Sequence, residues 1–331
     1  MNVVALTRQL VDIESISGNE AAVGDFLYEE LGKLGFQAEK MPVEADRFNV
    51  YATAPGQPNP AIFFSTHMDT VPPFIPSSED ATRIYGRGSC DAKGIIAAQV
   101  AAAEHLRRDG VHVGLLFLVG EERDSLGAKV ANRQSPGCKF LVNGEPTENK
   151  IAVASKGALR VEIVAEGRMA HSAYPELGES AIDKLLEAIN RVRGLKLPVA
   201  EDVGPCTLNI GLIEGGRAPN VIPDHARAEL FIRLVDSGDS TLAAIQRAVN
   251  GKVEVREPLR IPAQLLGTLP GFETTVVSFT TDIPALGPGW GRPFLIGPGS
   301  IHVAHTLEER IPKAQILEAI EIYKRMVQQL L

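Results

Sequence analysis

Four short apolar runs in this sequence each lead to a His or a Glu, with glycine close by. The runs cover residues 61–66, 113–119, 139–142 and 294–299. Continuous apolar runs of this length are typical of parallel strands that are buried on both faces. Helix-forming segments separate several of the runs, and this alternation predicts a doubly wound α/β sheet. No other feature of the sequence constrains the fold as strongly.

The side chains that follow these runs are of the kinds that bind metals or move protons. They are His67, Glu121, Glu122, Glu145 and His305. Ligands of open α/β sheets bind outside the carboxyl ends of the strands, so these side chains are expected to converge at one edge of the sheet. A further carboxylate, Asp91, lies in the glycine-rich segment 86–94, just before an Ala-rich segment that predicts a helix over residues 95–109.

Two imidazoles and three carboxylates form a ligand set that suits Zn²⁺, Mn²⁺ or Co²⁺. Five protein ligands exceed the three that one catalytic zinc ion usually takes. The set therefore predicts two ions about 3.5–4 Å apart that share one carboxylate, for which Asp91 is the candidate, and a bridging water. In the Glu121–Glu122 doublet, one carboxylate would bind metal and its neighbour would take a proton from that water, which implies hydrolysis of an acyl bond. Asp69 would hold the second N–H of the His67 imidazole.

Composition narrows the class of protein. The chain has 331 residues, 44% hydrophobic content and a formal charge of −8, and it lacks the basic stripe that a nucleic-acid binder or a two-metal phosphatase would use. No export signal and no apolar run of about 20 residues is present, so a cytoplasmic protein without a membrane span is expected. Three widely spaced cysteines indicate no disulfide framework.

The pattern of elements changes at residue 154. Strands are expected near residues 155–166, 206–213, 225–235 and 252–257, with helices over 179–192 and 241–250. This βαββαβ order predicts a ferredoxin-like α+β domain over residues 154–258. It would interrupt a catalytic domain made of residues 1–153 and 259–331, and His305 would then return to complete a site that begins at His67.

The sequence resembles the M20 family of metallopeptidases and amidohydrolases over nearly its whole length. The matching motifs are His67–Val71, Gly86–Gly94, Gly120–Glu122, Asn143–Thr147, Gly297–Gly299 and Ala304–Thr306. The resemblance implies two zinc ions, with Asp91 bridging, His67 and Glu145 on one ion, and Glu122 and His305 on the other. It also implies that Glu121 is the general base.

The resemblance further implies that the inserted domain is a lid that forms a homodimer contact. The segment 167–172 is similar to a loop whose His, here His171, stabilises the oxyanion in the neighbouring subunit's site. The segment 215–223 is similar to one whose Asn, here Asn220, meets the substrate. The resemblance implies that a later Arg also meets the substrate, and Arg233 is the candidate because its planar guanidinium can form a bidentate pair with a substrate carboxylate. A surface ion pair would explain Arg233 equally well. Backbone N–H groups near Gly299 could bind the same carboxylate.

The expected activity is removal of an acyl group from an N-acyl amino acid, most like that of acetylornithine deacetylase. Succinyl-diaminopimelate desuccinylase, an N-acetyl-lysine-type deacylase and a dipeptidase or carboxypeptidase that takes short peptides are the alternatives within the family. A catalytically silent homologue that only binds a ligand would be expected to lack the proton-relay residue or a metal ligand. Glu121 and all five ligands are present.

Overall fold

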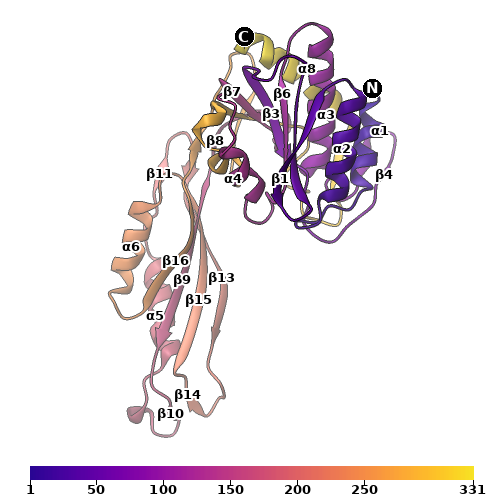
Figure 1. Ribbon diagram of the computed structural model, residues 1–331. Helices are drawn as coiled ribbons and strands as arrows, with labels where there is room; N and C mark the ends of the chain where they lie inside the picture. Colours follow the sequence, from indigo (N-terminus) through magenta and orange to yellow (C-terminus); the bar gives the residue numbers. More distant parts are fainter. The chain divides into compact units, whose positions relative to one another are not determined.

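The computed structural model describes residues 1–331 as two compact units. The first unit contains Met1–Val153, Leu266–Thr275 and Thr281–Leu331, and the second contains Ala154–Leu265 and Val276–Thr280. The second unit therefore extends past the expected boundary at residue 258. The reason is that strand β16 (Glu254–Ile261) stays paired with β9 (Gly157–Glu166) as far as Ile261. Figure 1 shows the elements of both units.

The first unit is built on a six-stranded sheet in the order β1-β2-β6-β3-β7-β19. Strands β6, β3, β7 and β19 run parallel, whereas β1 and β2 form an antiparallel edge. The strands are β1 (Gln37–Glu44), β2 (Arg47–Thr53), β3 (Ile62–His67), β6 (Gly114–Leu118), β7 (Phe140–Asn143) and β19 (Arg292–Leu295). The chain leaves β3 for β6 on one side and then crosses to β7 on the other, which is the doubly wound arrangement that the sequence predicted.

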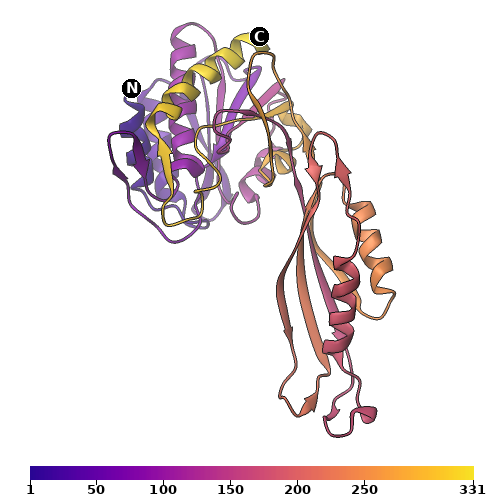
Figure 2. The ribbon, with the colours of Figure 1, turned by 180° about the vertical axis from the view of Figure 1, so that it is seen from behind.

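Helices cover both faces of this sheet. On one face lie α1 (Val3–Val11), α2 (Ala21–Lys33), α3 (Gly94–Arg108) and α8 (Lys313–Leu330), and Figure 2 shows α8, in yellow, beside α3. On the other face lie α4 (Leu126–Asn132) and α7 (Ile283–Leu286). Neighbouring residues of β3 serve opposite faces, because Phe64 packs on Tyr323 of α8 while Phe63 packs edge-on against Trp290.

Two local features were harder to predict from sequence. Strand β1 was not expected because Met41 is its one buried residue, so it gives no apolar run. A small sheet of β4 (Ser78–Glu79), β5 (Arg83–Tyr85) and β20 (Arg310–Pro312) also lacks such a run.

Helix α1 begins with a standard N-cap, since the Asn2 side chain accepts a hydrogen bond from the backbone N–H of Ala5.

The second unit is a four-stranded antiparallel sheet in the order β13-β15-β9-β16, with two helices on one face. Its elements are β9, α5 (Ala181–Arg193), β13 (Thr207–Gly215), β15 (His225–Leu234), α6 (Asp239–Val249) and β16. This order confirms the ferredoxin-like prediction. Smaller pieces are β10 (Ala170–His171), β14 (Val221–Ile222), β11 (Val199–Ala200) and β12 (Gly204–Pro205).

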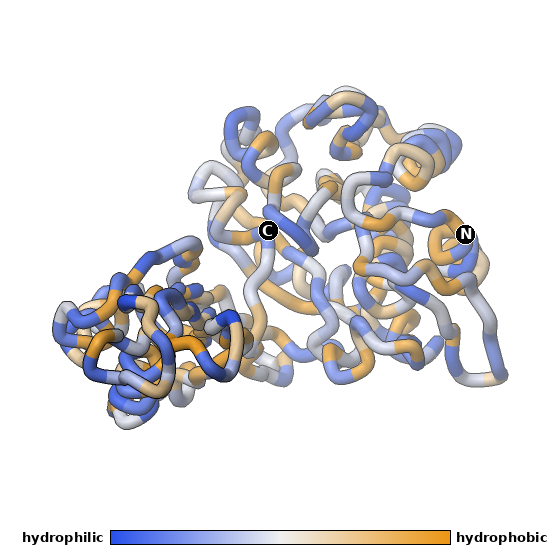
Figure 3. Tube along the Cα trace, turned by 90° about the horizontal axis from the view of Figure 1, so that it is seen from below, coloured by the Kyte–Doolittle hydropathy of each residue, from blue (hydrophilic) through white to orange (hydrophobic).

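Strands β8 (Ile151–Ser155), β17 (Gln264–Leu265) and β18 (Thr274–Val277) form a three-stranded sheet in the order β17-β8-β18. Hydrophobic and hydrophilic residues alternate along the chain of each unit, as expected of elements that bury one face (Figure 3). None of the helices combines the length and the apolar composition needed to cross a bilayer.

Candidate active site

The predicted ligands of the first unit lie where parallel strands end. His67 is the last residue of β3, the doublet Glu121–Glu122 follows β6, Glu145 follows β7, and His305 lies in the loop after β19. Since β6, β3, β7 and β19 are adjacent and parallel, their carboxyl ends meet at one edge of the sheet.

Asp91 lies between the two histidines. Its Oδ1 is 3.0 Å from Nε2 of His67, and its Oδ2 is 3.3 Å from Nε2 of His305. Nε2 of His305 is also 2.9 Å from Oε1 of Glu122. One ligand atom from each of His67, Asp91 and Glu122 lies within 4.8 Å of the others, a spacing that a metal ion could bridge. Each oxygen of Asp91 thus faces a different imidazole.

Asp91 owes this position to a glycine-rich turn. Gly88 has φ of 85°, and a Cβ there would lie 2.8 Å from the Thr70 side chain. Helix α3 begins at Gly94, where a Cβ would lie 2.5 Å from the backbone oxygen of Ser89. Asp91 is therefore buried at a loop-to-helix junction, as the sequence indicated.

The site concentrates negative charge. Burial raises the pKa of Glu145 well above its ordinary value, and the charges of Asp91 and Glu122 raise it further. Burial and the charge of Glu145 likewise raise the pKa of Glu121. Carboxylates crowded in this way destabilise one another unless protons or cations neutralise them. Imidazole nitrogens and carboxylate oxygens are ligands that zinc prefers, so the residues present fit a divalent cation site.

Asp69 ties the loop after β3 to the glutamate doublet. Its carboxylate accepts hydrogen bonds from the backbone N–H groups of Glu121 and Glu122, at 3.1 and 3.2 Å, and from the Ser17 hydroxyl at 2.6 Å. The Nδ1 atom of His67 is 3.0 Å from the backbone oxygen of Asp69 and 3.6 Å from its Oδ1. The N–H of the imidazole is thus oriented mainly by a backbone carbonyl, with the carboxylate behind it.

The expectation for Gly299 needs correction. Its backbone N–H donates to Oε1 of Gln315 at 2.8 Å, so this N–H is not available to a substrate carboxylate. Glycine is required there for another reason, because φ is 93° and a Cβ would lie 2.6 Å from Cβ of Cys90. His302, three residues before His305, is exposed.

Three predicted residues belong to the second unit. His171 is exposed on β10 and pairs with Val221 of β14, and the N–H of Ser172 donates to the backbone oxygen of Asn220 at 3.0 Å. His171 and Asn220 therefore lie together. Arg233, on β15, stacks on the Phe231 ring at 4.8 Å, and burial alone lowers its pKa, with no carboxylate partner contributing.

Sequence reasoning missed Asp282, which is buried and whose two carboxylate oxygens have no hydrogen-bond partner. Burial raises its pKa to about 7, and its charge in turn raises the pKa of Glu121 and Glu145. One signal was present, since Asp282 comes shortly after strand β18, just as His67, Glu121 and Glu145 come at or after the ends of strands. The buried pair of Arg87 and Glu309 was also missed.

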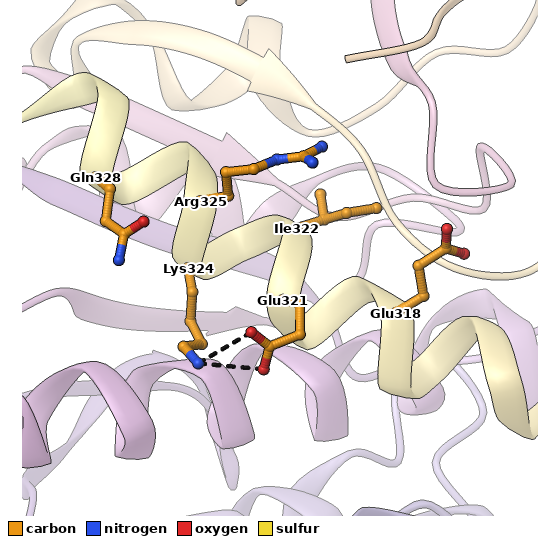
Figure 4. Close-up of a pocket in the computed structure, with 6 residues that line it drawn as sticks. All are labelled: Glu318, Glu321, Ile322, Lys324, Arg325 and Gln328. Carbon is orange, nitrogen blue, oxygen red and sulfur yellow. Dashed lines mark hydrogen bonds and ion pairs between the residues drawn. The ribbon is translucent and has the colours of Figure 1, made fainter. Parts of the chain in front are cut away.

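A separate hollow runs along α8 (Figure 4). It is lined by Glu318, Glu321, Ile322, Lys324, Arg325 and Gln328. All of its lining residues come from this one helix, and Lys324 bonds to both carboxylate oxygens of Glu321, at 3.0 and 3.1 Å. None of the site residues described above lines it.

Comparison with known proteins supports the resemblance. Residues 153–258 match the family model described as a peptidase dimerisation domain. A peptidase M20 domain-containing protein of Schizosaccharomyces pombe is 39% identical, over 98% of this chain and 84% of that protein. The chain belongs to the M20 peptidase family. A second relative of this M20 chain, from Aspergillus niger, is named "Probable carboxypeptidase" and is 38% identical over 97% of the chain and 88% of its own length.

Solved structures share the M20 fold at low sequence identity. The aminopeptidase PepT from Bacillus cereus matches with a TM-score of 0.83 and 21% identity, over 98% of this chain and 97% of that one. The YXEP protein of Bacillus subtilis, described as a dinuclear metal binding peptidase from the M20 family, matches with a TM-score of 0.73 and 15% identity, over 99% and 97%. The M20 chain is therefore a hydrolase that acts on amide or peptide bonds.

Proposed function

We propose that this protein is a two-metal hydrolase that cleaves the amide bond next to a free carboxylate, as a carboxypeptidase does. The observation that carries the proposal is the position of Asp91, which presents one oxygen to each histidine while His305 also contacts Glu122. The name of the Aspergillus niger relative supports the substrate class.

His67, Asp91 and Glu145 would hold one cation, and Glu122, Asp91 and His305 the other. The dinuclear peptidase from Bacillus subtilis supports a pair of ions, and the ligand types favour Zn²⁺ with Co²⁺ or Mn²⁺ as substitutes. Bound cations would supply Lewis acidity, which polarises the scissile carbonyl and makes water a stronger nucleophile near neutral pH.

Glu121 is the proposed proton carrier. As water adds to the carbonyl carbon, its proton passes to the Glu121 carboxylate, and the same proton then passes to the nitrogen as the C–N bond breaks. The products are a carboxylic acid and a free amine. The hydrogen bond between the Asp69 carboxylate and the Glu121 backbone N–H holds this residue in place.

Arg233 is the proposed anchor for the substrate carboxylate. Burial lowers its pKa below the usual value, and no protein carboxylate pairs with it, so a partner supplied by the substrate would satisfy a half-buried charge. An N-acyl amino acid carries the same carboxylate as a peptide, so acetylornithine deacetylase activity is the second candidate, supported only by the motifs of the sequence.

A substrate panel tests these two candidates. Zinc-loaded protein would be assayed for free amine release from dipeptides, from peptides with amidated C-termini, from N-acetylornithine and from N-succinyl-diaminopimelate. We expect turnover of dipeptides and a large loss on C-terminal amidation. Turnover of N-acetylornithine alone would favour the second candidate, and cleavage that ignores amidation would contradict the role of Arg233.

A homodimer is proposed because the substrate-binding candidates of the second unit lie at opposite ends of its sheet. Arg233 pairs with Ala158 at one end of β15, whereas His171 lies beyond the other end, past His225. Arg233 and His225 are eight residues apart on β15, or roughly 27 Å at about 3.4 Å per residue. One small substrate cannot contact both His171 and Arg233 of the same chain. A partner subunit that supplies His171 would resolve this, and the dimerisation-domain match supports one.

Complementation tests that arrangement. The variants His171→Ala and Glu121→Gln should each have little activity alone. Unfolding and refolding them together should restore about a quarter of wild-type activity per active site, because half of the dimers are mixed and each mixed dimer has one intact site. Mixtures that stay as inactive as the separate variants would contradict a site shared between subunits.

Metal binding should release protons. Contacts with Asp91 and Glu122 raise the pKa of His305 to about 10 in the metal-free protein, against about 6.5 in an unfolded chain. At pH 7.5 the ring carries a proton that a cation must displace, so metal affinity should rise with pH up to about 10. The raised pKa of His305 also stabilises the folded, metal-free protein. This contribution to the free energy of unfolding is fully present below about pH 6.5 and is lost as the pH rises through about 10. Calorimetric titration in two buffers of different ionisation enthalpy measures the release, and zero release at pH 7.5 would contradict the expectation.

A further inference from the structure

A buried ion pair lies behind the proposed metal site and does not belong to the ligand set. Nη1 of Arg87 is 2.5 Å from Oε2 of Glu309, and both side chains are almost completely buried. An ion pair in such a place gains little net stability, because both charges lose their hydration. Its presence therefore calls for a reason other than stability.

The second carboxylate oxygen of Glu309 suggests that reason. Oε1 accepts hydrogen bonds from the backbone N–H groups of Cys90 and Asp91, each at 3.3 Å. The Cys90 thiol also lies 3.6 Å from this oxygen. Arg87 thus pairs with Oε2 of Glu309, and Oε1 of Glu309 accepts from the backbone N–H groups of Cys90 and Asp91. The contact fixes the backbone from which the Asp91 carboxylate projects.

The same residues connect two distant parts of the chain. Arg87 is four residues before Asp91, and Glu309 is four residues after His305. The backbone N–H of Gly86 donates to the backbone oxygen of Glu309 at 3.1 Å, and β5 pairs with β20 immediately beyond. Segments more than 200 positions apart are therefore held in register at the point where Asp91 meets His305.

We infer that the Arg87–Glu309 pair positions Asp91 against His305, and thereby sets the affinity of the site for its cations. This inference rests on the proposed two-metal function. Glu309 touches neither cation nor substrate, so it is a positioning residue that acts through the Asp91 backbone. Groups that orient metal ligands in this way typically account for about 10- to 100-fold in metal affinity.

Two variants test the inference. Glu309→Gln removes the charge and leaves one oxygen to serve both Arg87 and the N–H groups. The double variant Arg87→Met with Glu309→Leu replaces the pair with apolar side chains of similar size, a change that is often neutral for stability. Glu104→Gln is the matched control, since Glu104 is also buried and paired with an arginine, Arg108, but lies toward the other end of α3.

The readouts are zinc affinity from competition with a chromophoric chelator, the visible absorption spectrum of the Co²⁺-loaded protein, and the melting temperature of the metal-free protein. Both Glu309 variants should bind zinc about 10- to 100-fold more weakly than wild type and show an altered Co²⁺ spectrum. The double variant should show this weaker zinc binding although its metal-free form melts near the wild-type temperature. The control Glu104→Gln should bind zinc with wild-type affinity.

Wild-type zinc affinity in either Glu309 variant would overturn the inference. If the double variant also melted at the wild-type temperature and bound zinc with wild-type affinity, the charges of the pair would not be needed to position Asp91. Failure of the wild-type protein itself to bind zinc would count against the proposed function, which separates the two claims.

Discussion

Replacing Glu121 with Gln is expected to lower kcat by about 10²- to 10⁴-fold, the usual contribution of a general base or acid. Gln has nearly the same shape as Glu but cannot accept the proton of the attacking water. The ligands His67, Asp91 and His305 are untouched, so metal content should stay at the wild-type level. Steady-state kinetics on a dipeptide, with metal content measured by elemental analysis, gives both numbers.

Glu308→Gln is the matched control for this experiment, because Glu308 is exposed and lies three residues after His305. It should keep wild-type kcat. Unchanged kcat in Glu121→Gln would remove Glu121 from the chemistry, and a loss of metal in that variant would mean that it is a ligand instead.

Replacing Asp91 with Asn should have the larger effect. The Asn side chain carries no negative charge to neutralise two cations. It also has one oxygen in place of two, so it cannot present an acceptor oxygen to both His67 and His305 as Asp91 does. We expect the protein to retain at most one tightly bound ion and to lose several orders of magnitude in kcat/KM, since both ions contribute to charge stabilisation. Metal titration and steady-state kinetics measure the two losses.

Asp109→Asn provides the comparison, because Asp109 is exposed at the far end of α3, the helix that follows Asp91. Its metal content and activity should match wild type. Full metal content and full activity in Asp91→Asn would contradict a shared carboxylate at this position.

The sequence predicted the catalytic sheet well because its parallel strands are buried on both faces and so read as apolar runs. Phe63 and Phe64 illustrate this, since each packs against a different helical layer. The same physics explains why β1 was missed, as an edge strand with Met41 as its one buried residue leaves no such run.

Residue type and position were enough to predict that Asp91 would lie near His67 and His305, which the structure shows. Contacts that depend on the path of the chain could not be predicted, and the roles assigned to the site residues stay predictions. The imidazoles and carboxylates at strand ends could be found from sequence. The hydrogen bond from Gly299 to Gln315 could not, because it joins a loop to α8 through a side chain that no motif marks. The contact between Glu309 and the Asp91 backbone is of the same kind.

Anomalous diffraction from crystals of the zinc-loaded protein is the most direct test of the two-cation site. We predict two zinc peaks about 3.5–4 Å apart, with Asp91 between them, His67 and Glu145 on one, and Glu122 and His305 on the other. A map with no zinc among these five side chains, from protein that hydrolyses its substrate, would contradict the proposed mechanism.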